Sequence, residues 1–372
     1  MYLACFKGHV YGSKDSQMKL KEIIAVLEAL APPSLQEEYD NSGLLVGNVD
    51  DDVSSTLISL DCTEAVVQEA VSKGVNLIIA HHPIVFSGLK RFNGNSYIER
   101  TVMSAIRHGI AIYAIHTNLD NVLHGVNGHF AKQLDLQQCT VLREKTDVMR
   151  AISVYVPKEH VHTVRTAMFE AGGGKIGNYD QCSFNVDGTG TFRPNNQAEP
   201  FSGQAGVQSE DQEVKVELVC PSHLVQKVIR AMKAAHPYEE VAYHVLALEN
   251  GLRSVGAGII GYLPEPMEEK DFLDALKAKF GSPVIKHTAL LGRKIQKVAL
   301  CGGSGVFLLR DAIRAGADIF VTADVKYHQF FDADNQLVLA DIGHFESEYK
   351  TGEIIAAELK HYFTTFAVHF ST

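Results

Sequence analysis

The sequence predicts an α/β protein, in which one α/β domain with a mixed or parallel sheet covered by helices is interrupted by an α+β insert. Two observations predict this fold class. Apolar runs of strand length alternate with helical segments towards both ends of the chain, and this alternation is typical of βαβ units. Between about residues 148 and 250 the pattern changes, which favours a separate unit there.

The 372 residues are enough for two or three domains. We divide the chain into a first α/β part over residues 18–145, an insert over residues 146–250 and a second α/β part over residues 251–372. Residues 1–17 precede the clear helical spacing that starts at Met18, and either an upstream start codon or a disordered tail would explain them. Hydrophobic residues make up 46% of the chain, so a sizeable core can form.

The first α/β part is expected to alternate helices and strands. Residues 63–74 predict a helix with Thr63 as its N-cap and Gly74 at its end. Because the strands are continuously apolar, helices are expected on both faces of the sheet. The expected helices cover residues 20–32, 63–74, 96–109 and 124–136, and the expected strands cover residues 55–62, 75–80 and 110–115.

The insert is expected to follow the order βαβ–βαβ, which suggests a ferredoxin-like sandwich. Residues 195–212 are rich in Gly, Asn, Gln, Pro and Ser without periodicity, and therefore predict a long exposed loop. The expected elements are a strand over 149–157, a helix over 158–174, two short strands joined by a turn within 179–194, a strand over 213–221, a helix over 222–237 and a strand over 240–250.

The second α/β part returns to the first pattern. Its expected strands cover residues 297–303, 318–323 and 335–343, and its expected helices cover residues 304–317 and 346–363. The simplest arrangement joins these elements to the first part in one domain.

Charge and composition exclude several classes of protein. The net charge of −10 disfavours nucleic acid as a main partner, because phosphate backbones select for basic patches. No apolar run is long enough to span a bilayer, and the first residues lack the apolar core of a signal peptide. The six cysteines include no C-x-x-C pair. We therefore expect a cytoplasmic protein with reduced thiols and no membrane partner.

Polar side chains follow four of the apolar runs. His81 and His82 follow one, and the segments HTNLD, DVKYH and HFESE follow the others. Ligands bind beyond the carboxyl ends of strands in open α/β sheets, so these segments are expected to converge. For a lone histidine pair, one core and one surface residue is the simpler interpretation. Pro83, however, cannot continue a central strand and places the pair where the strand breaks into a loop.

The spacing of these residues predicts a metal site. His344 and Glu348 are four residues apart, which places both on one face of a helix. His116 and Asp120 are also four residues apart, in a turn at a strand end. The candidates are His81, His82, His116, Asp120, His344 and Glu348. They are too many for one tetrahedral catalytic zinc but suit two ions that share a carboxylate. Taken singly, His116 could be structural, Asp120 a helix cap and Glu348 a solvated helix residue.

Six motifs carry a resemblance to a known family. They are YDNSGLLVG (39–47), AHHPIVF (80–86), IHTNLD (115–120), CGGSG (301–305), TADVKYH (322–328) and DIGHFESE (341–348). In this order they resemble the GTP cyclohydrolase I type 2-like, or Nif-three-like, family from about Met18 to the C-terminus. The insert, with HPYEEVAY (236–243), resembles the PII-like or CutA-like domain of the longer bacterial members.

The resemblance implies a Nif-three-like α/β domain with a dinuclear site. His81, Asp120 and Glu348 would hold one ion, and His82, His344 and Glu348 would hold the other, so that Glu348 bridges. His116 would lie close by, either supporting a ligand or acting as an acid or base. The resemblance also implies toroidal homohexamers, built as a dimer of trimers.

Two functions are compatible with these features. The first is a metal-dependent hydrolase of a small molecule, by ring opening of GTP or by phosphoester hydrolysis, with His116 and Glu348 catalytic and with Asn41, Lys326 and His328 as candidate substrate contacts. CGGSG could offer backbone N–H groups to an anion or could be only a tight turn. The second is a non-enzymatic regulatory protein that senses a metal or ligand through the insert. Two divalent ions per chain are expected, and imidazole with carboxylate suits Zn, Fe or Mn.

Overall fold

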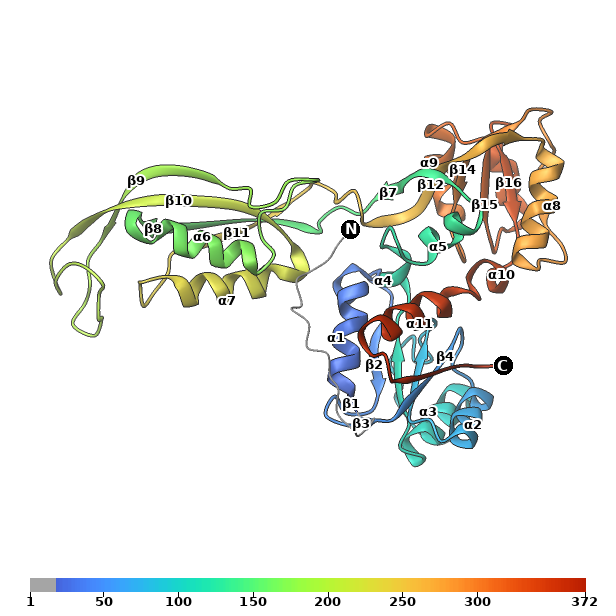
Figure 1. Cartoon of the computed structure of the whole chain (residues 1–372), viewed down its shortest axis with the longest axis horizontal. Coiled ribbons are helices and arrows are strands. Elements are labelled where there is room, and N and C mark those ends of the chain that lie inside the picture. The colour runs from blue at the N-terminus through green and yellow to red at the C-terminus, as the bar shows by residue number, and fades with distance from the viewer. Residues whose placement is uncertain (1–17) are drawn as a thin grey trace. The chain divides into compact units, whose positions relative to one another are not determined.

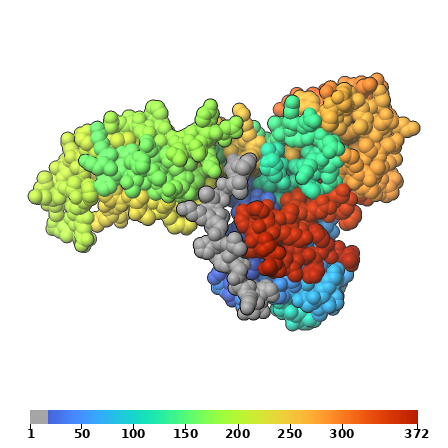
Figure 2. All heavy atoms as spheres, in the orientation of Figure 1, coloured from blue at the N-terminus to red at the C-terminus, as the bar shows by residue number. Residues whose placement is uncertain are grey.

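A computed structural model describes residues 18–372, and the expected N-terminal extension over residues 1–17 lies outside them. The described chain forms two compact units. Residues 145–252, which we call the insert, are green to yellow in Figures 1 and 2. Residues 18–144 and 253–372 together form the other unit, which we call the main unit. The chain therefore leaves the main unit, builds the insert and returns.

The first sheet of the main unit has five strands in the order β17-β4-β5-β6-β2. The strands β17, β4, β5 and β6 are parallel, and β2 pairs antiparallel with β6. Their bounds are Gly43–Val46 for β2, Ser55–Ser59 for β4, Leu77–Ala80 for β5, Ala111–Ala114 for β6 and Ala367–Phe370 for β17. A short pair, β1 (Met18–Lys19) with β3 (Asp52–Val53), lies apart from this sheet. The parallel βαβ core that the sequence predicts is thus confirmed.

Helices cover both faces of this sheet, as expected for strands that are apolar throughout. Successive residues of β5 point to opposite faces, so that Ile79 packs against α1 (Leu20–Leu30) and α11 (Thr351–Tyr362). Ile78 packs with α2 (Glu64–Lys73) and α3 (Tyr97–Arg107) on the other face (Figure 1). The predicted caps of α2 are also present, because the Thr63 side chain accepts a hydrogen bond from the backbone N–H of Val66 and Gly74 adopts the left-handed conformation.

The main unit contains a second sheet, where one sheet was expected. Its six strands lie in the order β13-β16-β15-β14-β12-β7. Their bounds are Gln137–Glu144 for β7, Gly256–Met267 for β12, Lys286–His287 for β13, Ile295–Leu300 for β14, Ile319–Thr322 for β15 and Val338–Asp341 for β16. Only β14, β15 and β16 pair in parallel. The expectation missed the antiparallel strands β7 and β12, which flank the insert and start a new sheet instead of extending the first.

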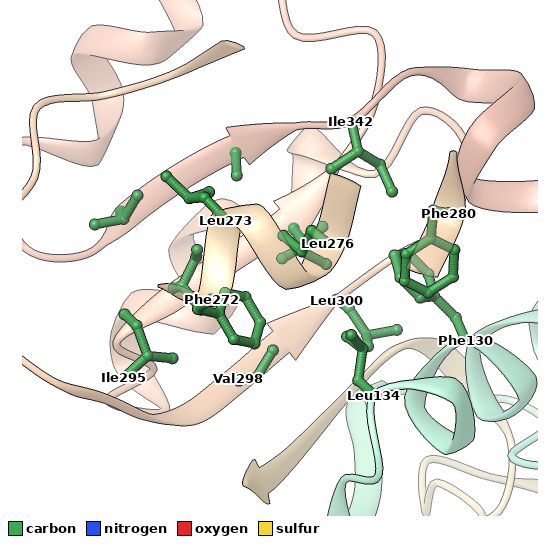
Figure 3. Close-up of a cluster of buried hydrophobic side chains, with 14 of the residues drawn as sticks. Phe130, Leu134, Phe272, Leu273, Leu276, Phe280, Ile295, Val298, Leu300 and Ile342 are labelled. Carbon is green, nitrogen blue, oxygen red and sulfur yellow. The ribbon is translucent and has the colours of Figure 1, made fainter. Parts of the chain in front are cut away.

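A buried apolar cluster holds the second sheet to its helices (Figure 3). Phe272 and Leu276 of α8 (Glu269–Phe280) and Phe130 of α5 (Val126–Gln133) pack against Val298 and Leu300 of β14. The opposite face packs against the helix α9 (Leu309–Arg314) through Leu309 and Ala312. Helices therefore cover both faces of this sheet as well.

The C-terminal helix expected over residues 346–363 is divided into two. The helix α10 spans His344–Glu348, and α11 begins at Thr351 after a break at Tyr349 and Lys350. Ile355 and Leu359 of α11 belong to the core of the first sheet, whereas Glu348 of α10 contacts the partly exposed histidines His82 and His344. One straight helix could not place Glu348 at the histidines and also place Ile355 and Leu359 in the apolar core. The chain therefore turns between α10 and α11.

The insert has the element order βαββαβ, and its four strands are all antiparallel in the order β11-β8-β10-β9. This element order is the one that defines ferredoxin-like units. Apolar residues of β8 and β10 pack beneath both helices, and the other face of the sheet carries no helix of the insert (Figure 1). The bounds are β8 Met149–Pro157, α6 Val161–Glu170, β9 Phe184–Phe192, β10 Ser209–Pro221, α7 Val225–Ala235 and β11 Tyr243–Leu248.

The prediction of two short strands within residues 179–194 is wrong. The structure has one strand there, β9, and Gly188 lies within it opposite Glu213 of β10. The Asp-Gly sequence at residue 187 is a common turn signal, but continuous pairing with β10 overrides it. Strand β10 also begins at Ser209, inside the segment expected to be loop.

Among residues 18–372, none of the helices has the length and apolar character that a membrane span requires. The described cysteines Cys62, Cys139, Cys182, Cys220 and Cys301 are all free thiols.

Candidate metal centre

The polar residues that were predicted to converge form one cluster in the main unit. Both sheets contribute to it, because β5 and β6 belong to the first sheet and β16 to the second. His81 and His82 follow β5, His116 and Asp120 follow β6, and His344 and Glu348 lie on α10 after β16. The prediction that these strand ends meet is therefore correct, although it assumed one sheet.

The histidine pair directly follows β5, which ends at Ala80, and its backbone is hydrogen-bonded to the residues at the end of β4 and just after it. The backbone N–H of His81 donates to the carbonyl of Ser59 at 3.1 Å, and that of His82 donates to the carbonyl of Leu60 at 2.9 Å. The two ring centroids are 5.0 Å apart, and His81 is buried while His82 is partly exposed.

Helix α10 places His344 and Glu348 one turn apart. Gly343, with φ of 97°, turns the chain immediately before His344, in a region that favours glycine. The Nε2 atom of His344 lies 3.0 Å from Oε2 of Glu348. The spacing that predicted a shared helical face is thus realised in a direct contact.

The cluster contains two groups of three side chains that share Glu348. One group is His81, Asp120 and Glu348, the other is His82, His344 and Glu348, and in each the ligand atoms lie within 4.8 Å of one another. Oε2 of Glu348 lies 3.1 Å from Nε2 of His82 and 3.9 Å from Nε2 of His81. His81, His82 and His116 form a third group by the same criterion. Glu348 is therefore common to two of the three groups.

Each of the four histidines has a hydrogen-bond acceptor at Nδ1. The acceptors are the carbonyl of Ile115 for His81 at 2.8 Å, Asp61 for His82 at 2.9 Å, Asp40 for His116 at 2.7 Å and Asp324 for His344 at 2.7 Å. Such a bond fixes which nitrogen carries the proton and leaves Nε2 free to bind a metal. Sequence reasoning did not assign this role to the three aspartates, although Asp324 begins the segment DVKYH that was expected to converge with the others.

Hydrogen bonds make the metal-free cluster a set of ion pairs. Burial lowers the pKa of His82, but hydrogen bonds to Asp61 and Glu348 outweigh burial and raise it to about 10. The hydrogen bond to Glu348 raises the pKa of His344 to about 9. Burial favours the neutral form of Glu348, yet hydrogen bonds from both histidines hold its pKa well below the usual range. Without metal, two imidazolium ions therefore surround one carboxylate at neutral pH.

The other half of the cluster, His81 and Asp120, makes no hydrogen bond to Glu348, and His81 is buried whereas Asp120 is partly exposed. Burial lowers the pKa of His81 to about 4, and burial together with the charge of Glu348 raises the pKa of Asp120 well above its usual value. Within the described chain, Nε2 of His81 and Oδ1 of Asp120 are buried and accept or donate no hydrogen bond. Such orphaned atoms are rare in folded proteins. Imidazole and carboxylate are ordinary ligands of Zn, Fe and Mn, so the donor set fits a divalent ion.

Asp40 forms the most buried support of the cluster. Its carboxylate accepts hydrogen bonds from Nδ1 of His116 at 2.7 Å and from the backbone N–H of Thr117 at 3.0 Å, and it also contacts the Thr117 hydroxyl. Burial opposes ionisation of Asp40, but the hydrogen bonds from His116 and Thr117 outweigh it and hold the pKa of Asp40 well below its usual value. Asp40 is therefore a fixed anion behind His116.

The three predicted substrate contacts lie in different surroundings. The Asn41 side chain donates to the carbonyl of Val85 at 2.6 Å and so braces the loop after His82. Lys326 and His328 are exposed on and before the 3₁₀ segment Tyr327–Ala333. No hydrogen bond or ion pair within residues 18–372 joins either side chain to the cluster. Their contact with a substrate stays a prediction.

The CGGSG motif forms a tight turn beside Glu348. Three of its backbone N–H groups are already engaged, because Gly302 donates to Asn127, Gly303 to Ser347 and Gly305 to Thr322. This favours the turn interpretation over an anion site. A Cβ atom at Gly303 would lie 2.2 Å from Oε1 of Glu348. The glycine therefore leaves room for the carboxylate.

The fold and the cluster together define a class of protein, a mixed α/β protein whose strand ends hold histidine and carboxylate groups suited to divalent metals. The family model described as Duf34/NIF3 (NGG1p interacting factor 3) matches residues 18–372. The chain belongs to this family, and the resemblance expected from its motifs is correct.

Particular relatives are similar over most of their length. A protein of Halalkalibacterium halodurans named GTP cyclohydrolase 1 type 2 homolog is 40% identical over 324 residues, 87% of each chain. A Bacillus subtilis protein of the same name is 37% identical over 327 residues, 87% of this chain and 88% of its own. The crystal structure of a Bacillus cereus protein related to NIF3 aligns with a TM-score of 0.82 and 37% identity, over 97% of this chain and 98% of its own.

Proposed function

We propose that the cluster binds two divalent metal ions and that the chain is a metal-dependent hydrolase of a small molecule. The observation that carries this proposal is the pair of three-residue groups that share Glu348. His81 and Asp120 would hold one ion and His82 and His344 the other, with Glu348 between them. Two bound ions supply an activated water and polarise the bond under attack.

The chain's own residues would place and serve the reacting groups. Asp61 and Asp324 hold the rings of His82 and His344 through Nδ1, so each Nε2 atom is fixed before a ligand arrives. Asp40 holds His116 in the same way. His116 is therefore positioned to accept or donate a proton at Nε2 during hydrolysis.

The substrate class is proposed from the names of the relatives. Two of them are called GTP cyclohydrolase 1 type 2 homolog, which supports hydrolytic opening of the purine ring of GTP as the first reaction to test. Phosphoester hydrolysis is the second, since paired metal ions also serve that chemistry.

Glu348→Gln tests the proposal directly. The substitution keeps the size of the side chain and removes the shared anion, so we expect loss of hydrolysis of GTP, assayed as formate release, or of a phosphoester, assayed as phosphate release. Glu346→Gln, on the same helix and outside the three metal-ligating groups, is the matched control and should stay active. Full activity of Glu348→Gln with two ions per chain would contradict the proposal.

A second candidate function is metal or ligand sensing through a PII-like or CutA-like insert. The βαββαβ order of the insert and a cavity beside its sheet support it. Ligand binding to the insert without turnover at the metal centre would favour this function over hydrolysis.

We also propose that the chain assembles as a homohexamer. The support is the uncovered face and edge of the insert sheet, where Phe184 is 71% exposed and Leu246 is 61% exposed. These two side chains lie on the two edge strands β9 and β11, and an edge strand offers unpaired backbone groups to a second copy of the chain. Light scattering on the purified chain tests the stoichiometry.

A further inference from the structure

The insert contains a cavity of about 300 Å³ that the metal centre does not involve. It lies at the end of the uncovered sheet face, under the loop that joins β9 to β10. The residues that shape it are Tyr155 of β8, Gly190 and Phe192 of β9, Glu213 of β10, Phe201 of the loop and Tyr238 after α7. All of them belong to the insert, so the cavity is complete within one compact unit.

A buried carboxylate without a cationic partner lies in the wall of this cavity. Glu213 is only 9% exposed. Its Oε1 atom accepts a hydrogen bond from the Tyr238 hydroxyl at 2.9 Å, and its Oε2 atom accepts none from residues 18–372. No lysine, arginine or histidine of the described chain lies within ion-pair distance of it. A buried charge without a counter-charge is costly, so this wall favours a positive ligand.

The neighbouring residues reinforce the negative character. The Tyr238 hydroxyl, whose single proton faces Glu213, also lies 3.2 Å from Oδ2 of Asp211, and the Ser202 hydroxyl binds the same Asp211 carboxylate. Glu239 and Glu240 line the cavity together with a single basic residue, Arg193. Acidic groups therefore outnumber basic ones.

The backbone leaves space for the Glu213 carboxylate. A Cβ atom at Gly190 would lie 2.3 Å from Oε2 of Glu213 and 2.6 Å from its carboxyl carbon. Glycine in a strand interior commonly marks a place where another group approaches closely. Here that group is the buried carboxylate at the cavity wall.

Aromatic rings form the rest of the wall. Tyr155, Phe192, Phe201 and Tyr238 all line the cavity, and the rings of Phe201 and Tyr238 are 5.9 Å apart. Aromatic faces attract organic cations, and most strongly when water is excluded. Among the described residues, no group of three metal-ligating side chains includes Glu213, and the cavity is far larger than a metal ion.

We propose that this cavity is a binding site for a small organic cation. Its ammonium group would lie against Oε2 of Glu213, and its apolar groups would lie against Phe201 and Tyr238. The site is separate from the metal centre, so it stands whether or not the proposed hydrolase activity is found.

Calorimetric titration of the full chain tests this site with two probes of equal shape. Choline carries a quaternary ammonium, and 3,3-dimethylbutan-1-ol is its uncharged carbon analogue. We expect saturable binding of choline and none of the alcohol. Putrescine is a third probe, and tighter binding of putrescine would assign the site to primary ammonium ions and equally support the proposal.

Variants tie the binding to the named residues. Glu213→Gln should weaken cation binding at least about tenfold, as expected for loss of a charged hydrogen-bond partner. Glu217→Gln makes the same charge change on the same strand, at a carboxylate already paired with Lys215, and should bind like the wild type. Phe201→Ala, at a side chain that is 54% exposed and thus dispensable for folding, should also weaken binding.

Three outcomes would overturn the proposal. The first is no saturable binding of choline or putrescine to the wild type. The second is a choline affinity in both Glu213→Gln and Phe201→Ala that equals that of the wild type. The third is binding of the uncharged alcohol as tight as that of choline.

Discussion

The histidines of the metal centre are held in place by acceptors that do not themselves touch the proposed ions. Asp61 and Asp324 bind Nδ1 of His82 and His344 at 2.9 and 2.7 Å. Each bond removes rotational freedom from a ring and directs its Nε2 atom towards Glu348. Groups of this kind commonly change metal affinity about 10- to 100-fold when they are removed.

Asp324→Asn should therefore lower metal affinity by roughly tenfold or more while the chain keeps its fold. Asp324 is half exposed, so the substitution leaves the core intact. Asp332→Asn, at an exposed residue of the following 3₁₀ segment, is the matched control. Metal titration with a competing chelator measures both variants, and equal affinities would show that Asp324 has no positioning role.

Metal binding should release protons, because the pKa of His82 is about 10 and that of His344 about 9 in the metal-free chain. Both imidazoles carry a proton at pH 7 and must lose it to bind an ion, so roughly two protons leave them. Affinity should accordingly rise as the pH increases from 7 towards 9, since protons compete less. Calorimetry in buffers of different ionisation enthalpy counts the protons, and a pH-independent affinity would contradict this assignment.

The sequence predicted the six histidine and carboxylate residues because each lies at a strand end or one turn along a helix. It did not predict the roles of Asp40, Asp61 and Asp324, because spacing along the chain does not show which ring nitrogen an aspartate faces. For Asn41 the sequence suggested a substrate contact, and the structure adds a bond to the carbonyl of Val85. Such contacts arise only when the loops are folded together.

At the scale of elements, the site depends on turns as much as on helices and strands. The CGGSG turn after β14 lies against Glu348, and Gly343 starts α10 with φ of 97°. Both turns use backbone conformations or close approaches that a side chain would obstruct. The position of Glu348 therefore explains Gly303, and the positive φ explains Gly343.

Gly303→Ala should cause loss of bound metal in addition to the loss of stability that its backbone conformation produces. With φ of 59°, the substitution costs about 1–2 kcal/mol of stability, and its Cβ would also displace the Glu348 carboxylate. Gly292→Ala, with φ of 73° and open space around it, carries the backbone cost alone. Thermal unfolding and metal content are measured for both. We expect similar destabilisation but loss of metal only in Gly303→Ala, and equal metal content would contradict the role of Gly303.

Element prediction succeeded where local signals and tertiary packing agree. The helix α2 has its predicted cap at Thr63 and its left-handed end at Gly74. It failed at β9, where the Asp-Gly signal at residue 187 was overridden by pairing with β10. The prediction of a single helix over residues 346–363 was also wrong. The break between α10 and α11 arises because α11 packs in the core of the first sheet while α10 places Glu348 at the histidines, and neither contact can be read from the local sequence.

At the scale of the whole molecule, the alternating pattern predicted a mixed α/β protein but not its division into two sheets. The strand ends that form the cluster come from β5 and β6 in one sheet and from β16 in the other. No periodicity distinguishes one sheet from two, because strands of both have the same apolar character.

The proposed assembly can be tested without disturbing the metal centre. Leu246→Arg places a charge on the uncovered face of the insert sheet, where the side chain is 61% exposed, and should reduce the hexamer to smaller species. Val284→Arg, at a 66% exposed position of the main unit, is the control. Light scattering after size exclusion measures both. A Leu246→Arg hexamer, or a wild type that is not hexameric, would refute this assembly.

The central claim is that two divalent ions bind the cluster, and elemental analysis of metal-repleted protein tests it most directly. Wild type and His361→Ala, which removes an exposed histidine of α11, should each contain about two ions per chain. His82→Ala should contain about one, because it removes a ligand from only one of the two groups. No bound metal in the wild type, or an unchanged content in His82→Ala, would contradict the claim.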